Sequence, residues 1–238
     1  MAIKGILFDF GGTLDTNGDH WSEVLWRGYQ HFGIAVEKKD FRDAYVHGER
    51  TLATHPIVTA DFHFVDVLRA KLRIQLEWLS GHGFLPALAT DNVETLADDM
   101  ARYVDGLTHE TLAHSREVLS RLKATYPLVL VSNFYGNIQT VLEDAGFDSC
   151  FRQVIESAVV GVRKPNPAIF ALGVCALDLP ASEVLVVGDS YTKDILPARS
   201  LGCHTLWIKG LQWEDTPFDE TLTDGVITRL DHIFDYLK

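Results

Sequence analysis

Four short segments of the chain consist almost entirely of hydrophobic residues, and each ends in polar or glycine-rich residues. They are residues 3–9, 127–133, 183–189 and 203–209. None of them alternates between apolar and polar positions, which is typical of strands that are covered on both faces. The pattern therefore predicts four buried strands.

The segments between the later runs have the periodicity of helices. Helices are predicted over residues 115–126, 137–146, 167–179 and 194–202. Two of these segments, 137–146 and 194–202, end in a glycine, as is common at helix C-termini. Strands that alternate with helices predict an α/β fold, a Rossmann-like parallel sheet with helices on both faces.

Residues 16–112 interrupt this alternation. They contain no buried strand run but four amphipathic, helix-like stretches, and in the last two of these apolar residues recur three and four positions apart. A lone parallel strand at 3–9 must pair with strands beyond residue 126, so we interpret this region as a helical insert after the first strand. A helical N-terminal domain beside that strand is the alternative. The predicted division is a catalytic core of residues 1–15 and 113–238, and a helical cap domain of residues 16–112.

Composition and charge narrow the classes of partner. With 33 acidic and 21 basic residues, the formal net charge is −12, which disfavours binding to nucleic acid or to an anionic membrane. Three cysteines without a CxxC spacing favour neither a disulfide framework nor a zinc site. The chain has no 18-residue apolar span and no signal-peptide pattern, so we predict a cytoplasmic protein. Oligomeric state is not predicted.

Polar side chains stand at or shortly after the ends of the predicted strands. They are Asp9, Ser132, Asn133, Lys164, Asp189 and Asp194. Taken singly, each has an ordinary structural interpretation: an acid that caps a helix, a serine–asparagine turn, or a surface lysine. In an open parallel sheet, however, ligands bind beyond the carboxyl ends of the strands. Their shared position therefore indicates one site.

The residue types suggest a task for that site. Two carboxylates about 4 Å apart repel by about 4 kcal/mol at an effective dielectric constant near 20. A Mg²⁺ ion removes this repulsion and leaves a coordination position for a phosphate oxygen. A lysine and a serine–asparagine pair supply donors to phosphate oxygens, and Asp9 is then free to attack phosphorus. The pattern predicts phosphoryl transfer from a small phosphorylated metabolite.

The same residues resemble the four signature segments of the haloacid dehalogenase-like hydrolase superfamily. The segments are DFGGTLD, LVLVSN, Lys164 before PNPAIF, and GDSYTKDI, in the family's order and over essentially the whole chain. The helical stretch after the first segment looks like the small α-helical cap of that superfamily. This cap is expected to close over the site and select the substrate.

The resemblance implies a role for each matching residue. It implies Asp9 as nucleophile, with Ser132 and Lys164 as further catalytic residues. Phosphate binding is implied for Gly12, Thr13, Ser132, Asn133 and Lys164, with Thr13 also orienting the nucleophile loop. A Mg²⁺ site is implied at Asp9, the Gly11 backbone carbonyl, Asp189 and Asp194.

One position departs from the family's phosphatase pattern. Those phosphatases have DxD in the first segment, and the second Asp protonates the leaving oxygen and activates water. In this chain that residue is Gly11. Its carbonyl remains available to a metal, but a lost general acid–base typically costs a factor of 10²–10⁴, about 3–5 kcal/mol.

Four functions remain open from the sequence. The first is a phosphatase that obtains its acid–base from Asp15, Asp19 or His20, or from a metal-bound water, and favours leaving groups of low pKa. The second is a metal-independent hydrolase such as a 2-haloacid dehalogenase, although three uncompensated acids suit a carboxylate substrate poorly.

The third is phosphonate cleavage, which in this superfamily uses a cap lysine as a Schiff base, for which Lys38, Lys39 and Lys71 are candidates. The fourth is a catalytically weak member that binds a phosphorylated ligand or a protein. Among the polar residues of the cap, His47 and Arg50 are the ones we expect to face the cleft.

Overall fold

The computed structural model describes residues 2–85, 90–213 and 218–237. In these residues six strands form one sheet in the order β3-β2-β1-β4-β5-β6, and every neighbouring pair is parallel. The strands are β1 (Gly5–Phe8), β2 (Leu128–Ser132), β3 (Gln153–Glu156), β4 (Val184–Gly188), β5 (His204–Ile208) and β6 (Gly225–Ile227). The predicted parallel sheet is confirmed, with four strands close to their predicted places. The two edge strands, β3 and β6, were not predicted.

Alternate residues of the central strand β1 pack on opposite faces of the sheet. Ile6 and Phe8 belong to a buried hydrophobic group with residues of α5 and α6, whereas Leu7 belongs to a second group with residues of α8 and α9. Both faces are therefore covered, which explains why the strands are apolar throughout. The helices are α5 (His109–Leu122), α6 (Ile138–Asp144), α7 (Ser157–Val160), α8 (Ala168–Leu177) and α9 (Leu196–Ser200).

The segment predicted as a helix from residue 194 begins earlier. A π-helical turn, η2 (Tyr191–Ile195), precedes α9 and contains Asp194. Three short 3₁₀-helices complete the core: η1 (Ala181–Glu183), η3 (Glu220–Leu222) and η4 (Leu230–Asp235).

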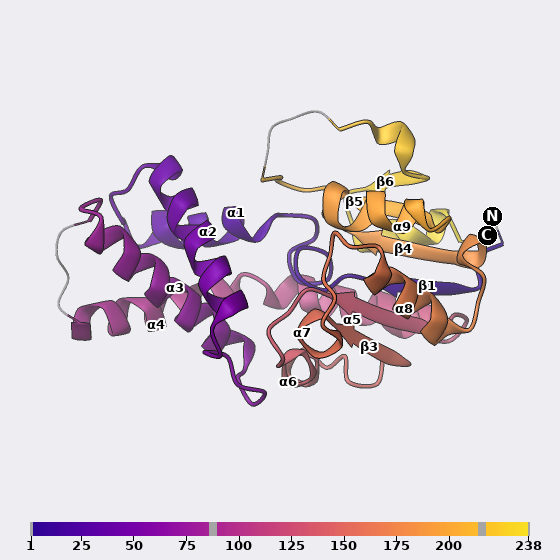
Figure 1. The fold of residues 1–238 in the computed structure, drawn as a ribbon, viewed down its shortest axis with the longest axis horizontal. Helices are drawn as coiled ribbons and strands as arrows, with labels where there is room; N and C mark the ends of the chain where they lie inside the picture. Colours follow the sequence, from indigo (N-terminus) through magenta and orange to yellow (C-terminus); the bar gives the residue numbers. More distant parts are fainter. Residues whose placement is uncertain (1, 86–89, 214–217, 238) are drawn as a thin grey trace.

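Of the five described helices between β1 and β2, the first four form a separate group, here called the helical bundle. They are α1 (Trp21–His31), α2 (Lys38–Thr54), α3 (Phe64–Gly81) and α4 (Thr90–Gly106). The bundle has its own buried hydrophobic residues, among them Leu25, Phe41, Leu72 and Leu76. It lies to one side of the sheet, whereas both chain termini lie at the far end of the sheet (Figure 1). No helix among the described residues combines the length and apolar character needed to cross a membrane.

Candidate active site

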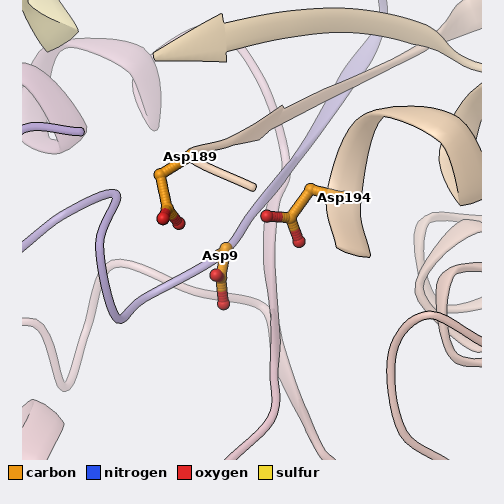
Figure 2. A group of neighbouring side chains, drawn as sticks. All are labelled: Asp9, Asp189 and Asp194. Carbon is orange, nitrogen blue, oxygen red and sulfur yellow. The ribbon is translucent and has the colours of Figure 1, made fainter. Parts of the chain in front are cut away.

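Three carboxylates meet at the carboxyl edge of the sheet. Asp9 follows β1, Asp189 follows β4, and Asp194 lies in the π-helical turn that comes next. One oxygen of each lies within 4.8 Å of the others, and Figure 2 shows the three side chains gathered together, with Asp9 between Asp189 and Asp194. All three are buried. The structure thus brings together the three acids that the sequence suggested.

A glycine lets the loop after β1 approach this cluster. Gly12 has a φ of +96°, and a Cβ built on it would lie 2.3 Å from the carboxyl group of Asp189. Two reasons exclude a side chain at this position: the positive φ is unfavourable for residues other than glycine, and a Cβ would overlap with the carboxyl group of Asp189. Next to it, the Thr13 hydroxyl donates to Asp189 Oδ1 at 3.2 Å. The two residues therefore hold the loop against the acid rather than simply facing a ligand.

Lys164 is buried among the acids. Its Nζ lies 2.8 Å from Asp9 Oδ1 and 2.6 Å from Asp194 Oδ1. Burial alone lowers the pKa of Lys164, but the charges of Asp194 and Asp9 raise it above its ordinary value. The side chain is therefore a fixed ammonium that can hold an anionic oxygen beside Asp9.

One lysine does not balance three acids. Burial, together with the charges of Asp194 and Asp9, raises the pKa of Asp189 well above its usual range. Burial also raises the pKa of Asp194 to about 6, although Lys164 lowers it. A cluster of hard oxygen donors with excess negative charge fits a divalent cation such as Mg²⁺.

Ser132 is the last residue of β2 and Asn133 follows it, and both line the same cavity as Lys164. The Asn133 side chain is turned to the backbone of Lys164: Nδ2 donates to its carbonyl at 3.1 Å, and Oδ1 accepts from its N–H at 2.9 Å. Asn133 therefore fixes the lysine in place. Ser132 is 2% exposed.

The site opens into a cavity of about 580 Å³. Its lining comes from the strand ends of the core and from the helical bundle, including Trp21, Tyr45, Glu49 and Lys71. The bundle thus contributes part of the wall, as a substrate-selecting cap would. His47 and Arg50, expected to face the cleft, are exposed and do not line it; Tyr45 and Glu49 on the same helix do. Glu49 has no local sequence signal, because its partners come from elsewhere in the chain.

The candidates for the missing acid–base lie in different places. Asp19 pairs with Arg27 at 2.5 Å and accepts from the Leu211 N–H, away from the cavity. Asp15 is buried behind the loop, where it accepts from the Gly12 N–H at 2.7 Å and from Trp21 Nε1 at 3.0 Å. Burial raises the pKa of Asp15 to about 7.

His20 is the member of this set that lines the cavity. Its Nδ1 accepts from the Ser22 N–H at 3.2 Å at the start of α1, and burial lowers the pKa of His20 to about 4. At neutral pH the ring is therefore uncharged with its proton on Nε2, which makes it a hydrogen-bond donor rather than a strong acid.

The three lysines considered as Schiff-base residues also differ in their position relative to the cavity. Lys38 pairs with Glu23 at 2.6 Å, and neither Lys38 nor Lys39 lines the cavity. Lys71 does line it, but its Nζ lies 2.6 Å from Glu49 Oε1. Although burial lowers it, the charge of Glu49 raises the pKa of Lys71. A protonated lysine is a poor nucleophile for a Schiff base.

Comparison with known proteins agrees with this geometry. The family model for haloacid dehalogenase-like hydrolases matches residues 3–202. A phosphoserine phosphatase from Thermus thermophilus is 32% identical over 155 residues, which are 64% of this chain and 60% of that protein. The match thus spans less than two thirds of the relative's own length.

Solved structures share the fold over the whole chain. The protein YfnB from Bacillus subtilis, bound to magnesium, has a TM-score of 0.63 at 20% identity, with 100% of each chain covered. A dehalogenase solved with an intermediate complex has a TM-score of 0.66 at 15% identity, covering 99% of this chain and 97% of that one. At these identities the likeness establishes the fold and does not distinguish a phosphatase from a dehalogenase. Together with the family match, the acid cluster and the buried lysine show that the chain belongs to the haloacid dehalogenase-like hydrolases.

Proposed function

We propose that the chain is a magnesium-dependent phosphohydrolase of a small phosphorylated metabolite. The observation that carries the proposal is the convergence of Asp9, Asp189 and Asp194 on the buried ammonium of Lys164, at the inner end of a large cavity. The phosphatase relative supports the same class of substrate.

The residues present fit a Mg²⁺ ion, and Asp9, Asp189, Asp194 and the Gly11 carbonyl would hold it. When bound, the ion supplies positive charge that offsets the carboxylates and the substrate phosphate. Lys164, held by Asn133, and Ser132 orient the phosphate oxygens. Asp9 attacks phosphorus, the P–O bond to the leaving group breaks, and an aspartyl phosphate forms. Attack by water on this phosphorus then releases inorganic phosphate and restores Asp9.

Proton transfer is the step that this site performs weakly. Gly11 has no carboxyl group, so a leaving oxygen must depart with little help from residue 11. Substrates whose leaving groups have a low pKa, such as aryl or acyl phosphates, are therefore expected to react fastest.

The alternatives fit the site less well. Without a cation, three acids and one lysine would repel the carboxylate of a 2-haloacid. Phosphonate cleavage by a Schiff base needs an uncharged cap lysine, and the ion pair with Glu49 keeps Lys71 protonated.

The proposal is tested with p-nitrophenyl phosphate in the presence and absence of Mg²⁺. Hydrolysis should require the ion, and Asp9→Asn should lower it on the order of 10³-fold or more, because the nucleophile is lost. Release of halide from a 2-haloacid in excess chelator, with no phosphate ester turned over, would instead support the dehalogenase alternative.

A further inference from the structure

The part of the cavity formed by α2 and α3 contains an ion pair that phosphoryl transfer does not use, between a buried lysine and a glutamate whose side chain is 33% exposed. Lys71 Nζ lies 2.6 Å from Glu49 Oε1, and the Tyr135 hydroxyl donates to Glu49 Oε2 at 2.8 Å. The Lys71 side chain is only 8% exposed. All three residues line the cavity. We call them the distal cluster.

The packing of two helices creates this cluster. A Cβ on Gly48 would lie 3.3 Å from Gln75 Cγ and 3.7 Å from the Lys71 carbonyl, so α2 and α3 approach closely at this point. Tyr135 reaches the bundle from the loop after β2 and packs against the buried group of Leu52, Ala70 and Ile74. The cluster is thus built from three distant parts of the chain.

An ion pair with a buried lysine is weak evidence for stability, because desolvation of the lysine offsets the attraction between the two charges. The wall of the cavity combines polar side chains with the apolar Leu52, Val58, Phe64 and Val67. Polar groups placed among apolar ones are typical of a site that orients a ligand. An ammonium has three N–H donors, and the contact with Glu49 engages one of them. Lys71 can therefore also donate to an oxygen of a ligand.

The charges around the cavity indicate which oxygen. Among the described residues that line it, four are acidic and four are basic: Asp9, Glu49, Asp189, Asp194, Lys71, Arg163, Lys164 and Lys193. The formal charges of these eight residues cancel, and the two positive charges of a Mg²⁺ ion would offset the two negative charges of a phosphate dianion. The rest of the ligand then needs no net charge. A carboxylate on it would add a negative charge that this overall balance leaves uncompensated.

We infer that the distal cluster binds a hydroxyl or carbonyl oxygen of an uncharged leaving group. Lys71 donates to this oxygen, and Glu49 accepts from the hydroxyl while Tyr135 keeps Glu49 in place. The substrates are then phosphate monoesters of uncharged, hydroxylated compounds, and esters of hydroxy acids are disfavoured. This inference rests on the proposed function and adds the class of leaving group.

Two ligands that differ in a single group provide the test. Glycerol 3-phosphate has a CH₂OH group where 3-phosphoglycerate has a carboxylate. Calorimetry with Mg²⁺ and the Asp9→Asn variant, which cannot turn over, should show at least about tenfold tighter binding of glycerol 3-phosphate. Equal or tighter binding of 3-phosphoglycerate, or no measurable binding of either ligand, overturns the inference.

A second variant tests the residue itself. Adding Glu49→Gln to the Asp9→Asn variant removes one negative charge but keeps an acceptor for Tyr135. The preference for glycerol 3-phosphate over 3-phosphoglycerate, measured as the ratio of their dissociation constants, should therefore fall by about tenfold. Glu77→Gln is the matched control, because Glu77 lies on α3 beside Arg73 and outside the cavity; its ratio should not move. An unchanged ratio in the Glu49 variant overturns the inference.

Binding of O-phosphoserine tests whether the distal cluster recognises a zwitterionic group instead of a hydroxyl. If it binds more tightly than glycerol 3-phosphate, the cluster recognises an ammonium and a carboxylate together, and the inference is overturned. These measurements need no turnover. Hydrolysis of p-nitrophenyl phosphate, which has neither hydroxyl nor carboxylate, decides the proposed function separately.

Discussion

At residue 11 the chain has no side chain, and the space beside it is bounded by Trp21 and Asp15. A Cβ built on Gly11 would lie 3.5 Å from Trp21 Nε1 and 4.0 Å from Asp15 Oδ2. These are ordinary van der Waals distances, so the surroundings leave room for a Cβ at this position. The contacts of the Cβ therefore give no steric reason for a glycine here.

Gly11→Asp should therefore raise the turnover of an alkyl phosphate on the order of 10²-fold, because it restores a proton donor. The nearby Asp15 carboxyl favours the protonated form of the new acid. The gain should be smaller with p-nitrophenyl phosphate, whose leaving group needs little protonation. Steady-state kinetics on both esters measures the difference.

Gly11→Asn is the control, since it has the same size but no titratable proton. If both variants lose activity equally, the substrate itself uses the space beside Gly11, and the interpretation as a missing acid is wrong.

At the scale of elements, the end of β4 and the π-helical turn after it set the position of two acids. A Cβ on Gly188, the last residue of β4, would lie 2.5 Å from both Cβ and Cγ of Asp194. Asp194 Oδ2 also accepts from the Ser190 N–H at 3.0 Å. The turn is therefore wound tightly against the strand end.

Gly188→Ala should displace Asp194 and weaken the metal site. A displacement of about 1 Å typically lowers activity on the order of 10²-fold, and Mg²⁺ affinity measured by calorimetry should fall with it. Gly106→Ala at the end of α4, where a Cβ meets no atom within 4 Å, should change neither quantity. Normal Mg²⁺ affinity in the Gly188 variant would show that Asp194 is not a ligand.

The sequence allowed prediction of those elements whose signal is local. β1, β2, β4 and β5 are buried on both faces and therefore appear as continuous apolar runs. β3 begins with the exposed Gln153, and β6 has only three residues, so neither produces such a run.

The same distinction holds for the candidate site. Asp9 and Asp189 follow predictable strands, so their meeting at one edge was predictable. The pairing of Glu49 with Lys71 depends on how α2 packs against α3, and the hydrogen bonds of Asn133 depend on a loop 31 residues away. Such contacts leave no pattern along the chain.

At the scale of the whole molecule, the helical bundle and the sheet have separate groups of buried hydrophobic residues. They also touch: Asn137 Nδ2 donates to the Phe62 carbonyl at 2.9 Å, and Thr140 Oγ1 donates to the Ala60 carbonyl at 2.8 Å. Both contacts join α6 to the loop before α3. The proposed division into core and cap predicts that the two parts unfold locally and independently of each other despite these contacts.

Leu76→Ala tests this division. Leu76 is fully buried in the bundle, so the change should lower the free energy of unfolding of that part by about 2–5 kcal/mol. Hydrogen exchange followed by mass spectrometry should then become faster in α1–α4 and stay unchanged in β1, β2 and β4. Equal acceleration in all of them would mean that bundle and sheet unfold as a single cooperative unit.

The stretch from Ser132 to Tyr135 serves both ends of the cavity within four residues. Ser132 ends β2 at the carboxyl edge of the sheet, Asn133 hydrogen-bonds to the backbone of Lys164, and the Tyr135 hydroxyl donates to Glu49 of the bundle. An insertion or deletion there would disturb reaction and recognition at once. We therefore expect new substrate preferences to arise more readily from substitutions in α2 and α3. Such substitutions can change the shape of the cavity wall without moving Ser132 or Asn133.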